Sequence, residues 1–131
     1  MFSKRALTVV VPLTTATLLA VANPASAKDG DREVQRTGSC SASADWTLKA
    51  KQDDGRIEVE LEVDSNRAGQ TWSVRLTDNG KQVFSGRRVT QAPSGSFSIE
   101  RHTANLAGVD RFRGTARNAA TGETCTALLR F

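Results

Sequence analysis

The chain has 131 residues, of which 18 are basic, 14 are acidic and 38% are hydrophobic. This length provides for one domain and excludes a second hydrophobic core. Two of the basic residues belong to an N-terminal leader, which leaves a small positive excess on the remaining chain. Such an excess does not by itself indicate a nucleic-acid-binding protein.

Residues 1–27 have the pattern of a secretory signal peptide. Two basic residues precede an apolar run over residues 6–22, and residues 24–27 supply a small-x-small cleavage site before Lys28. A membrane anchor is the alternative, but Pro12 and three threonines interrupt the run, which falls short of the roughly 20 apolar residues that a span needs. We therefore expect a secreted, extracellular protein with no membrane span after leader removal.

The remaining residues predict an all-β domain. We expect a disordered tail over residues 28–33 and a single β-sandwich domain over residues 34–131. From Glu33 onward, short alternating runs are broken by Gly, Asn, Asp and Pro, and no helical periodicity of useful length is present. The first strand is expected at about residues 34–41.

The clearest strand covers Arg56 to Asp64, where four apolar residues alternate with four acidic ones. This alternation predicts one buried and one solvated face. Asp54-Gly55 favours a two-residue turn before the strand. Pairing across this turn matches apolar with apolar and charged with charged residues, so the register is strongly specified. The expected pairs are Asp53–Arg56, Lys51–Glu58, Ala50–Val59, Lys49–Glu60, Leu48–Leu61 and Trp46–Val63.

Asn79-Gly80 marks a second hairpin, flanked by alternating apolar residues. Phe84 is out of phase with that alternation, and Gly86 suggests a nearby bulge that resets it. After a loop at residues 93–95, the run from Ser96 to Glu100 predicts another short strand, with its phenylalanine and isoleucine facing inward.

The last hairpin runs from Asp110 to Phe131 around residues 119–122. Its inner faces match when Asn118 is paired with Glu123, and Cys125 then points inward. The expected pairs are Asn118–Glu123, Ala116–Cys125, Gly114–Ala127 and Phe112–Leu129.

Cys40 and Cys125 are the only cysteines. In an oxidising compartment we expect them to form one disulfide that joins the two ends of the domain. The chain-entropy model assigns roughly 4 to 5 kcal/mol to closing a loop of about 85 residues. A catalytic or metal-binding thiol is the alternative, but the chain has no CxxC motif and only one histidine.

Residues 106–123 resemble the last hairpin of immunoglobulin-like domains, in which an aspartate, a tyrosine corner, a cysteine, an alanine, an asparagine and a glycine follow one another. Phe112 stands in the tyrosine place and Gly114 in the cysteine place. The matching residues are Ala116, Asn118 and Gly122. Trp72 corresponds to the core tryptophan of that family, and Leu61 lies in the region of its first cysteine.

This resemblance implies an antiparallel two-sheet sandwich that is immunoglobulin-like, with about 7–8 strands. An unrelated sandwich with a similar tight hairpin is the alternative. The whole chain is also similar to small secreted bacterial β-proteins, which implies a location and nothing about activity.

Catalysis is poorly supported, and we expect neither an enzyme nor a metal or cofactor. His102 is the only histidine and lies in a polar stretch at a strand end, which favours a solvated loop residue over a base. Glu58, Glu60 and Glu62 form a row at intervals of about 7 Å, which invites a glycosidase or calcium interpretation. Because lysines face two of these glutamates, we interpret the row as a paired, solvated surface.

The other sheet has the more distinctive outer face. Arg75 on one strand and Arg111, Arg113 and Arg117 on another are expected to point outward among serines and threonines, and Arg130 extends this set. Guanidinium forks and hydroxyls suit phosphates or carboxylates. An ordinary soluble edge, on which arginine discourages strand addition, is the alternative. No outer aromatic platform is expected, so nucleic acid is not the expected ligand.

These observations predict a secreted, non-catalytic binding or interaction module whose arginine-rich face engages an anionic envelope polymer or an acidic protein. The alternative is a small inhibitor of a secreted hydrolase that presents residues 64–70 or 87–95 as a docking loop. A hydrolase that uses the carboxylate row is the third class. The sequence specifies neither the partner nor the oligomeric state.

Overall fold

The computed structural model describes residues 32–131, so the expected leader and residues 28–31 of the expected tail lie outside the described residues. The described residues form eight strands and no helix, and hence no helix that could cross a membrane. The strands are β1 (Glu33–Ser39), β2 (Asp45–Asp53), β3 (Arg56–Asp64), β4 (Thr71–Asp78), β5 (Lys81–Val89), β6 (Ser96–Ala104), β7 (Arg111–Asn118) and β8 (Thr124–Arg130).

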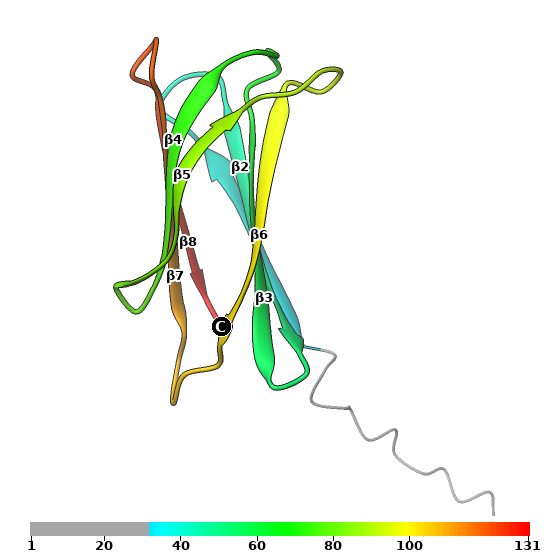
Figure 1. The fold of residues 1–131 in the computed structure, drawn as a ribbon, viewed down its shortest axis with the longest axis vertical. Helices are drawn as coiled ribbons and strands as arrows, with labels where there is room; N and C mark the ends of the chain where they lie inside the picture. The colour runs from blue at the N-terminus through cyan, green and yellow to red at the C-terminus, as the bar shows by residue number, and fades with distance from the viewer. Residues whose placement is uncertain (1–31) are drawn as a thin grey trace, which may run out of the picture.

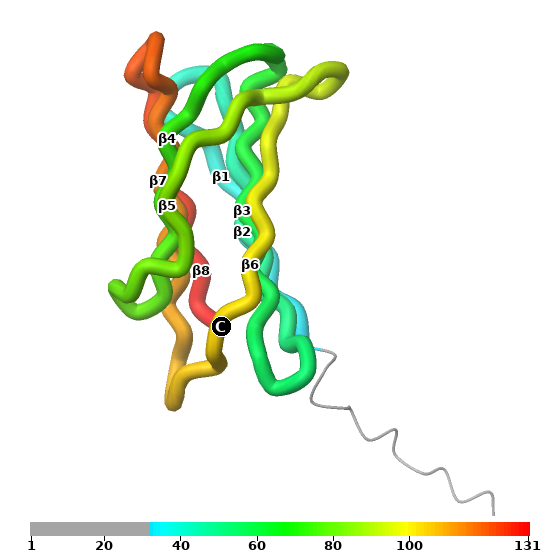
Figure 2. The backbone as a smooth tube through the Cα atoms, viewed as in Figure 1, coloured from blue at the N-terminus to red at the C-terminus, as the bar shows by residue number. Residues whose placement is uncertain are grey.

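The strands form two antiparallel sheets that pack face to face (Figure 1). The first sheet has the order β1-β2-β3-β6 and the second has the order β5-β4-β7-β8. Each of the β2–β3, β4–β5 and β7–β8 hairpins stays within one sheet, and the chain crosses between the sheets after β3, β5 and β6. The backbone tube follows the same two layers (Figure 2). The expected all-β, two-sheet antiparallel architecture is confirmed.

Two of the predicted hairpin registers are confirmed. β2 and β3 pair Asp53 with Arg56 and Leu48 with Leu61, as expected from the turn between them. Asp54 and Gly55 in that turn have φ angles of 48° and 75°, the left-handed values that such a turn requires. β7 and β8 pair Ala116 with Cys125. Alternating polarity and turn chemistry therefore determine both registers.

The β4–β5 hairpin contains the bulge that was expected near Gly86. Leu76 pairs with Phe84 whereas Thr77 pairs with Gln82, so Val83 is the extra residue. This bulge reverses the phase of the strand and turns Phe84 inward, where it is 9% exposed. Gly86 is not the bulge residue but leaves room for Phe84, because a Cβ at position 86 would lie 3.0 Å from the Phe84 ring.

Two strand ends also differ from expectation. β1 begins at Glu33, which pairs with Lys51, and the main-chain nitrogen of Gln52 donates to the oxygen of Arg32 at 2.9 Å. The expectation that the tail extends to residue 33 is therefore wrong, because Arg32 and Glu33 both pair with β2. β6 continues to Ala104 rather than ending at Glu100, because it pairs with the whole of β3.

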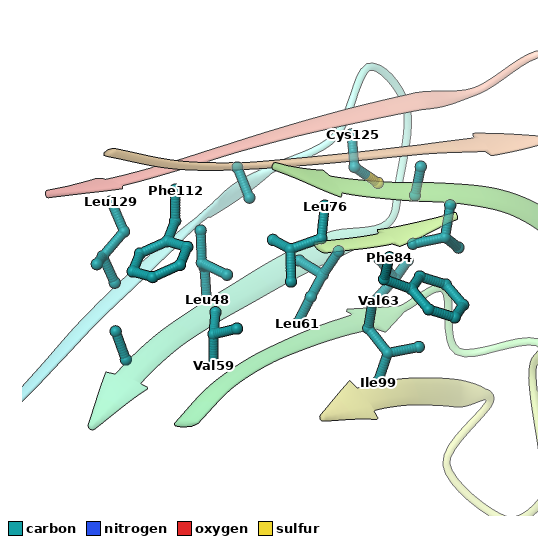
Figure 3. Close-up of a cluster of buried hydrophobic side chains, with 14 of the residues drawn as sticks. Leu48, Val59, Leu61, Val63, Leu76, Phe84, Ile99, Phe112, Cys125 and Leu129 are labelled. Carbon is teal, nitrogen blue, oxygen red and sulfur yellow. The ribbon is translucent and has the colours of Figure 1, made fainter. Parts of the chain in front are cut away.

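The core lies between the sheets. Leu48, Val59 and Leu61 of the first sheet meet Leu76 and Phe112 of the second (Figure 3). All five side chains are at most 1% exposed. This packing follows from the two-residue alternation, which directs every second side chain into the same layer.

The disulfide between Cys40 and Cys125 is confirmed. Cys40 directly follows β1, whereas Cys125 lies on β8 and is 2% exposed. The bond therefore connects the first sheet to the second through segments near the two ends of the domain. A disulfide is compatible with an extracellular protein.

Candidate binding surface

The four arginines predicted to point outward are exposed on the solvent side of the second sheet. Arg75 lies on β4, and Arg111, Arg113 and Arg117 alternate along β7 with buried residues. The structure adds Arg87 of β5, which the bulge turns outward, and Arg130 of β8 is exposed on the same side as expected. We call these residues the arginine face: Arg75, Arg87, Arg111, Arg113, Arg117 and Arg130.

Cross-strand pairing places hydroxyl groups beside these arginines. Arg117 lies between Ser73 and Thr124, and Arg75 lies between Ser85 and Thr115. These neighbours contribute to an open depression of about 640 Å³ that crosses the middle of the sheet. Its outward-pointing lining consists of Ser73, Arg75, Ser85, Arg87, Thr115, Arg117, Thr124 and Thr126. The surface therefore offers many hydrogen-bond donors in one shallow area.

The arginine face carries no compensating negative charge. Within residues 32–131 the only close contacts between basic and acidic side chains are the two made by His102 of the first sheet, so none involves these arginines. The four strands of the second sheet contain one carboxylate, Asp78, and it is buried. Arg111 and Arg130 are direct cross-strand partners, an arrangement that destabilises a sheet when both charges are alike. A bound anion would relieve this repulsion.

Asp78 and Asp110 form a buried pair of carboxyl groups, with exposures of 2% and 1%. Burial raises the pKa of Asp78 to about 7, and the neighbouring Asp110 carboxyl adds to the rise, while a contact with the Arg111 backbone opposes it. The main-chain nitrogen of Leu106 donates to Asp110 at 3.3 Å. These two acids face the interior and are not part of the exposed surface.

The outer face of the first sheet holds the carboxylate row. Glu58, Glu60 and Glu62 lie on the solvent side of β3, and the predicted register with the two lysines is confirmed. The expected lysine–glutamate ion pairs are nevertheless absent among the described residues, where the only close contacts between basic and acidic side chains are those of His102. Being cross-strand neighbours does not bring these long, solvated side chains into contact.

His102 differs most from its sequence-based interpretation. It lies on β6 directly opposite Glu58, not in a loop. Its Nε2 is 3.1 Å from Asp53 Oδ2 and 3.5 Å from Glu58 Oε2. The sequence offered no signal for this cluster, because β3 and β6 are not joined by a hairpin turn that would set their register.

The two segments considered as docking loops are bonded together at one end of the sandwich. The main-chain nitrogen of Ser65 donates to the oxygen of Gly95 at 3.0 Å. Thr90 is 1% exposed, and its hydroxyl donates to the Arg67 oxygen while accepting from the nitrogen of Gln70 at 2.9 Å. Gly95 has a φ of 74°, and a Cβ there would clash with the backbone of Arg67. This loop end is a single hydrogen-bonded unit.

Comparisons with protein-family models, with curated proteins and with solved structures found no match to this chain.

Proposed function

We propose that the chain is a secreted, non-catalytic binding module that engages an anionic polymer outside the cell through the arginine face. The observation that carries this proposal is the presence of exposed arginines on all four strands of one sheet, with no exposed carboxylate on those strands. Arginine binds phosphate or carboxylate through two parallel hydrogen bonds, which suits a ligand with repeated anionic groups.

The shape of the surface favours a polymer over a small molecule. The depression is shallow and open, and the arginines continue beyond it to Arg111 and Arg130 at the far end of the sheet. A chain of anionic groups can contact several guanidinium groups at once, so that individually weak contacts add through effective concentration. The neighbouring serines and threonines provide further donors for the same ligand.

We propose further that the sandwich is immunoglobulin-like. The order β5-β4-β7-β8 corresponds to the C′, C, F and G strands of that family, and β3 and β6 correspond to the neighbouring B and E strands. Trp72 is fully buried on the strand that corresponds to C. A Cβ on Gly114 would lie 2.9 Å from Cδ2 of Leu61, so these two residues face each other where the family places its inter-sheet disulfide.

The decisive experiment compares elution of the mature protein from columns of immobilised polyphosphate and polyglutamate. The variant Arg113→Ala/Arg117→Ala removes two guanidinium groups from the arginine face and is expected to elute at clearly lower salt. Lys49→Ala/Lys51→Ala removes the same charge from the opposite sheet and is the matched control. Equal elution of the folded arginine variant and the wild type would remove the proposal, and the better-retaining column identifies the anionic group.

The bonded loop end favours a second candidate, the inhibitor of a secreted hydrolase. Loops held in one conformation lose little entropy on docking, which is the property that makes a presented loop bind tightly. Arg67 and Gln91 are exposed within this loop end. A hydrolase captured from culture medium by the wild type, lost with Arg67→Ala/Gln91→Ala and retained with Arg113→Ala/Arg117→Ala, would support the inhibitor.

A further inference from the structure

Three metal-ligating side chains meet on the outer face of the first sheet. The Nε2 atom of His102 lies 3.1 Å from Asp53 Oδ2 and 3.5 Å from Glu58 Oε2. Each residue offers a ligand atom, and the three ligand atoms all lie within 4.8 Å of one another. We propose that Asp53, Glu58 and His102 bind one divalent transition-metal ion of the zinc class.

The fold positions the three ligands on three adjacent strands. Glu58 of β3 and His102 of β6 are direct cross-strand partners, so their side chains leave the sheet side by side. Asp53 is the last residue of β2, and the tight turn at residues 54–55 holds it diagonally across from Glu58. The site therefore needs only small side-chain adjustments, because the strand register already brings the ligands together.

The donor set and its dimensions fit zinc. Ligand atoms at 2.0–2.2 Å from a tetrahedral zinc ion lie about 3.3–3.5 Å from one another, close to the two His102 distances. Two carboxylates balance the charge of a divalent ion, and the imidazole adds a nitrogen ligand. Calcium takes six to eight oxygen ligands, so an imidazole with two carboxylates suits it poorly. Three protein ligands leave a fourth position open to water or to an external donor.

Two cations near the site limit its affinity. Lys51 is the cross-strand partner of Glu58, and the guanidinium of Arg56 donates to the carbonyl oxygen of His102 at 3.1 Å. The His102 and Asp53 side chains are both 43% exposed, so water competes for the ion as well. We therefore expect only moderate affinity, with dissociation constants in the micromolar range.

The test uses the fact that His102 is the only histidine. Zinc chloride is titrated into the mature protein at pH 7.5. Binding is measured by calorimetry, and the imidazole resonances are observed by NMR. We expect one ion per chain, a shift of the His102 resonances and a rise in the melting temperature, since the ion would connect β2, β3 and β6. Calcium chloride at the same concentrations is expected to produce none of these effects.

The variants separate a built site from general attraction to carboxylates. His102→Ala and Glu58→Gln are each expected to weaken zinc binding by more than about tenfold. Glu62→Gln removes a carboxylate from the same face of β3 without touching the cluster and is expected to bind zinc as the wild type does. Unmoved His102 resonances in the wild type at millimolar zinc would overturn the proposal, as would equal affinity in the folded His102→Ala variant.

Discussion

The two outer faces of the sandwich have the same architecture and opposite chemistry. On the first sheet, lysines and a histidine are interspersed with the acidic residues, and Glu58 approaches His102. On the second sheet every outward charge is positive, and Arg111 even faces Arg130. Solubility is served by a mixture of charges, as on the first sheet. The single sign of the second sheet is therefore the better indication of a ligand.

The largest expected effect comes from breaking the covalent link between the two sheets. Cys40→Ala/Cys125→Ala releases the disulfide and, by the chain-entropy model, lowers the free energy of unfolding by about 4 kcal/mol. Urea denaturation monitored by tryptophan fluorescence measures this loss. A loss below about 1 kcal/mol would mean that apolar packing in the core between the sheets, rather than the disulfide, holds the sheets together.

The next effect comes from reversing the charge of the arginine face. Arg75→Glu/Arg113→Glu/Arg117→Glu gives this face the carboxylates that it lacks, and we expect polyanion affinity to fall by about 100-fold, or roughly 2.7 kcal/mol. Binding measured at several salt concentrations should also show a shallower salt dependence. Lys49→Glu/Lys51→Glu is the control with fewer changes, and a comparable loss there would show that net charge alone controls retention.

The one carboxylate on the strands of the second sheet predicts a pH dependence. The folded-state pKa of Asp78 is raised to about 7 from 3.8, so the folded protein holds a proton that the unfolded chain has released between these values. The free energy of unfolding therefore falls as pH rises from about 4 to 7. Asp78→Asn removes this contribution, and between pH 4 and pH 8 its stability should improve relative to wild type by on the order of 2 to 4 kcal/mol.

Urea denaturation at several pH values measures this prediction. Glu62→Gln neutralises an outward carboxylate of the first sheet and is the control for neutralising any acid. Parallel stability profiles of Asp78→Asn and the wild type would contradict the raised pKa.

The smallest effect is expected on the first face. Glu60 lies opposite Lys49 without forming an ion pair, so Glu60→Gln should change the free energy of unfolding by less than about 0.5 kcal/mol. Thermal unfolding at low and high salt measures the difference. A clear, salt-sensitive loss would show that this face is stabilised by its charges after all.

The parts of the fold that the sequence predicts are those set by neighbouring residues. Asp54-Gly55 and the alternation on either side determine the β2–β3 register. The turn and the alternation of the β7–β8 hairpin likewise direct Cys125 inward. The position of the bulge could not be read, because Val83 and Phe84 are both apolar and either can be the inserted residue. The sequence therefore does not predict the phase beyond the bulge or the outward orientation of Arg87.

The contacts of His102 are unpredictable from the sequence for a different reason. Its neighbour Glu58 lies 44 positions earlier in the chain, and the two strands meet only through the sheet order. No local pattern encodes that order, because it depends on how the hairpins pack against one another. Functional sites assembled from separate hairpins are correspondingly harder to predict from sequence than a face whose residues alternate along one strand.

The disulfide has a consequence for survival in a protease-containing medium. Cys40 and Cys125 enclose every turn and loop from residue 41 to residue 124. A protease that cuts any one of these connections leaves both pieces covalently attached, and the paired strands can keep them in register. Cleavage of a single peptide bond would then leave the mass and the fold nearly unchanged until a reductant breaks the disulfide and releases the fragments.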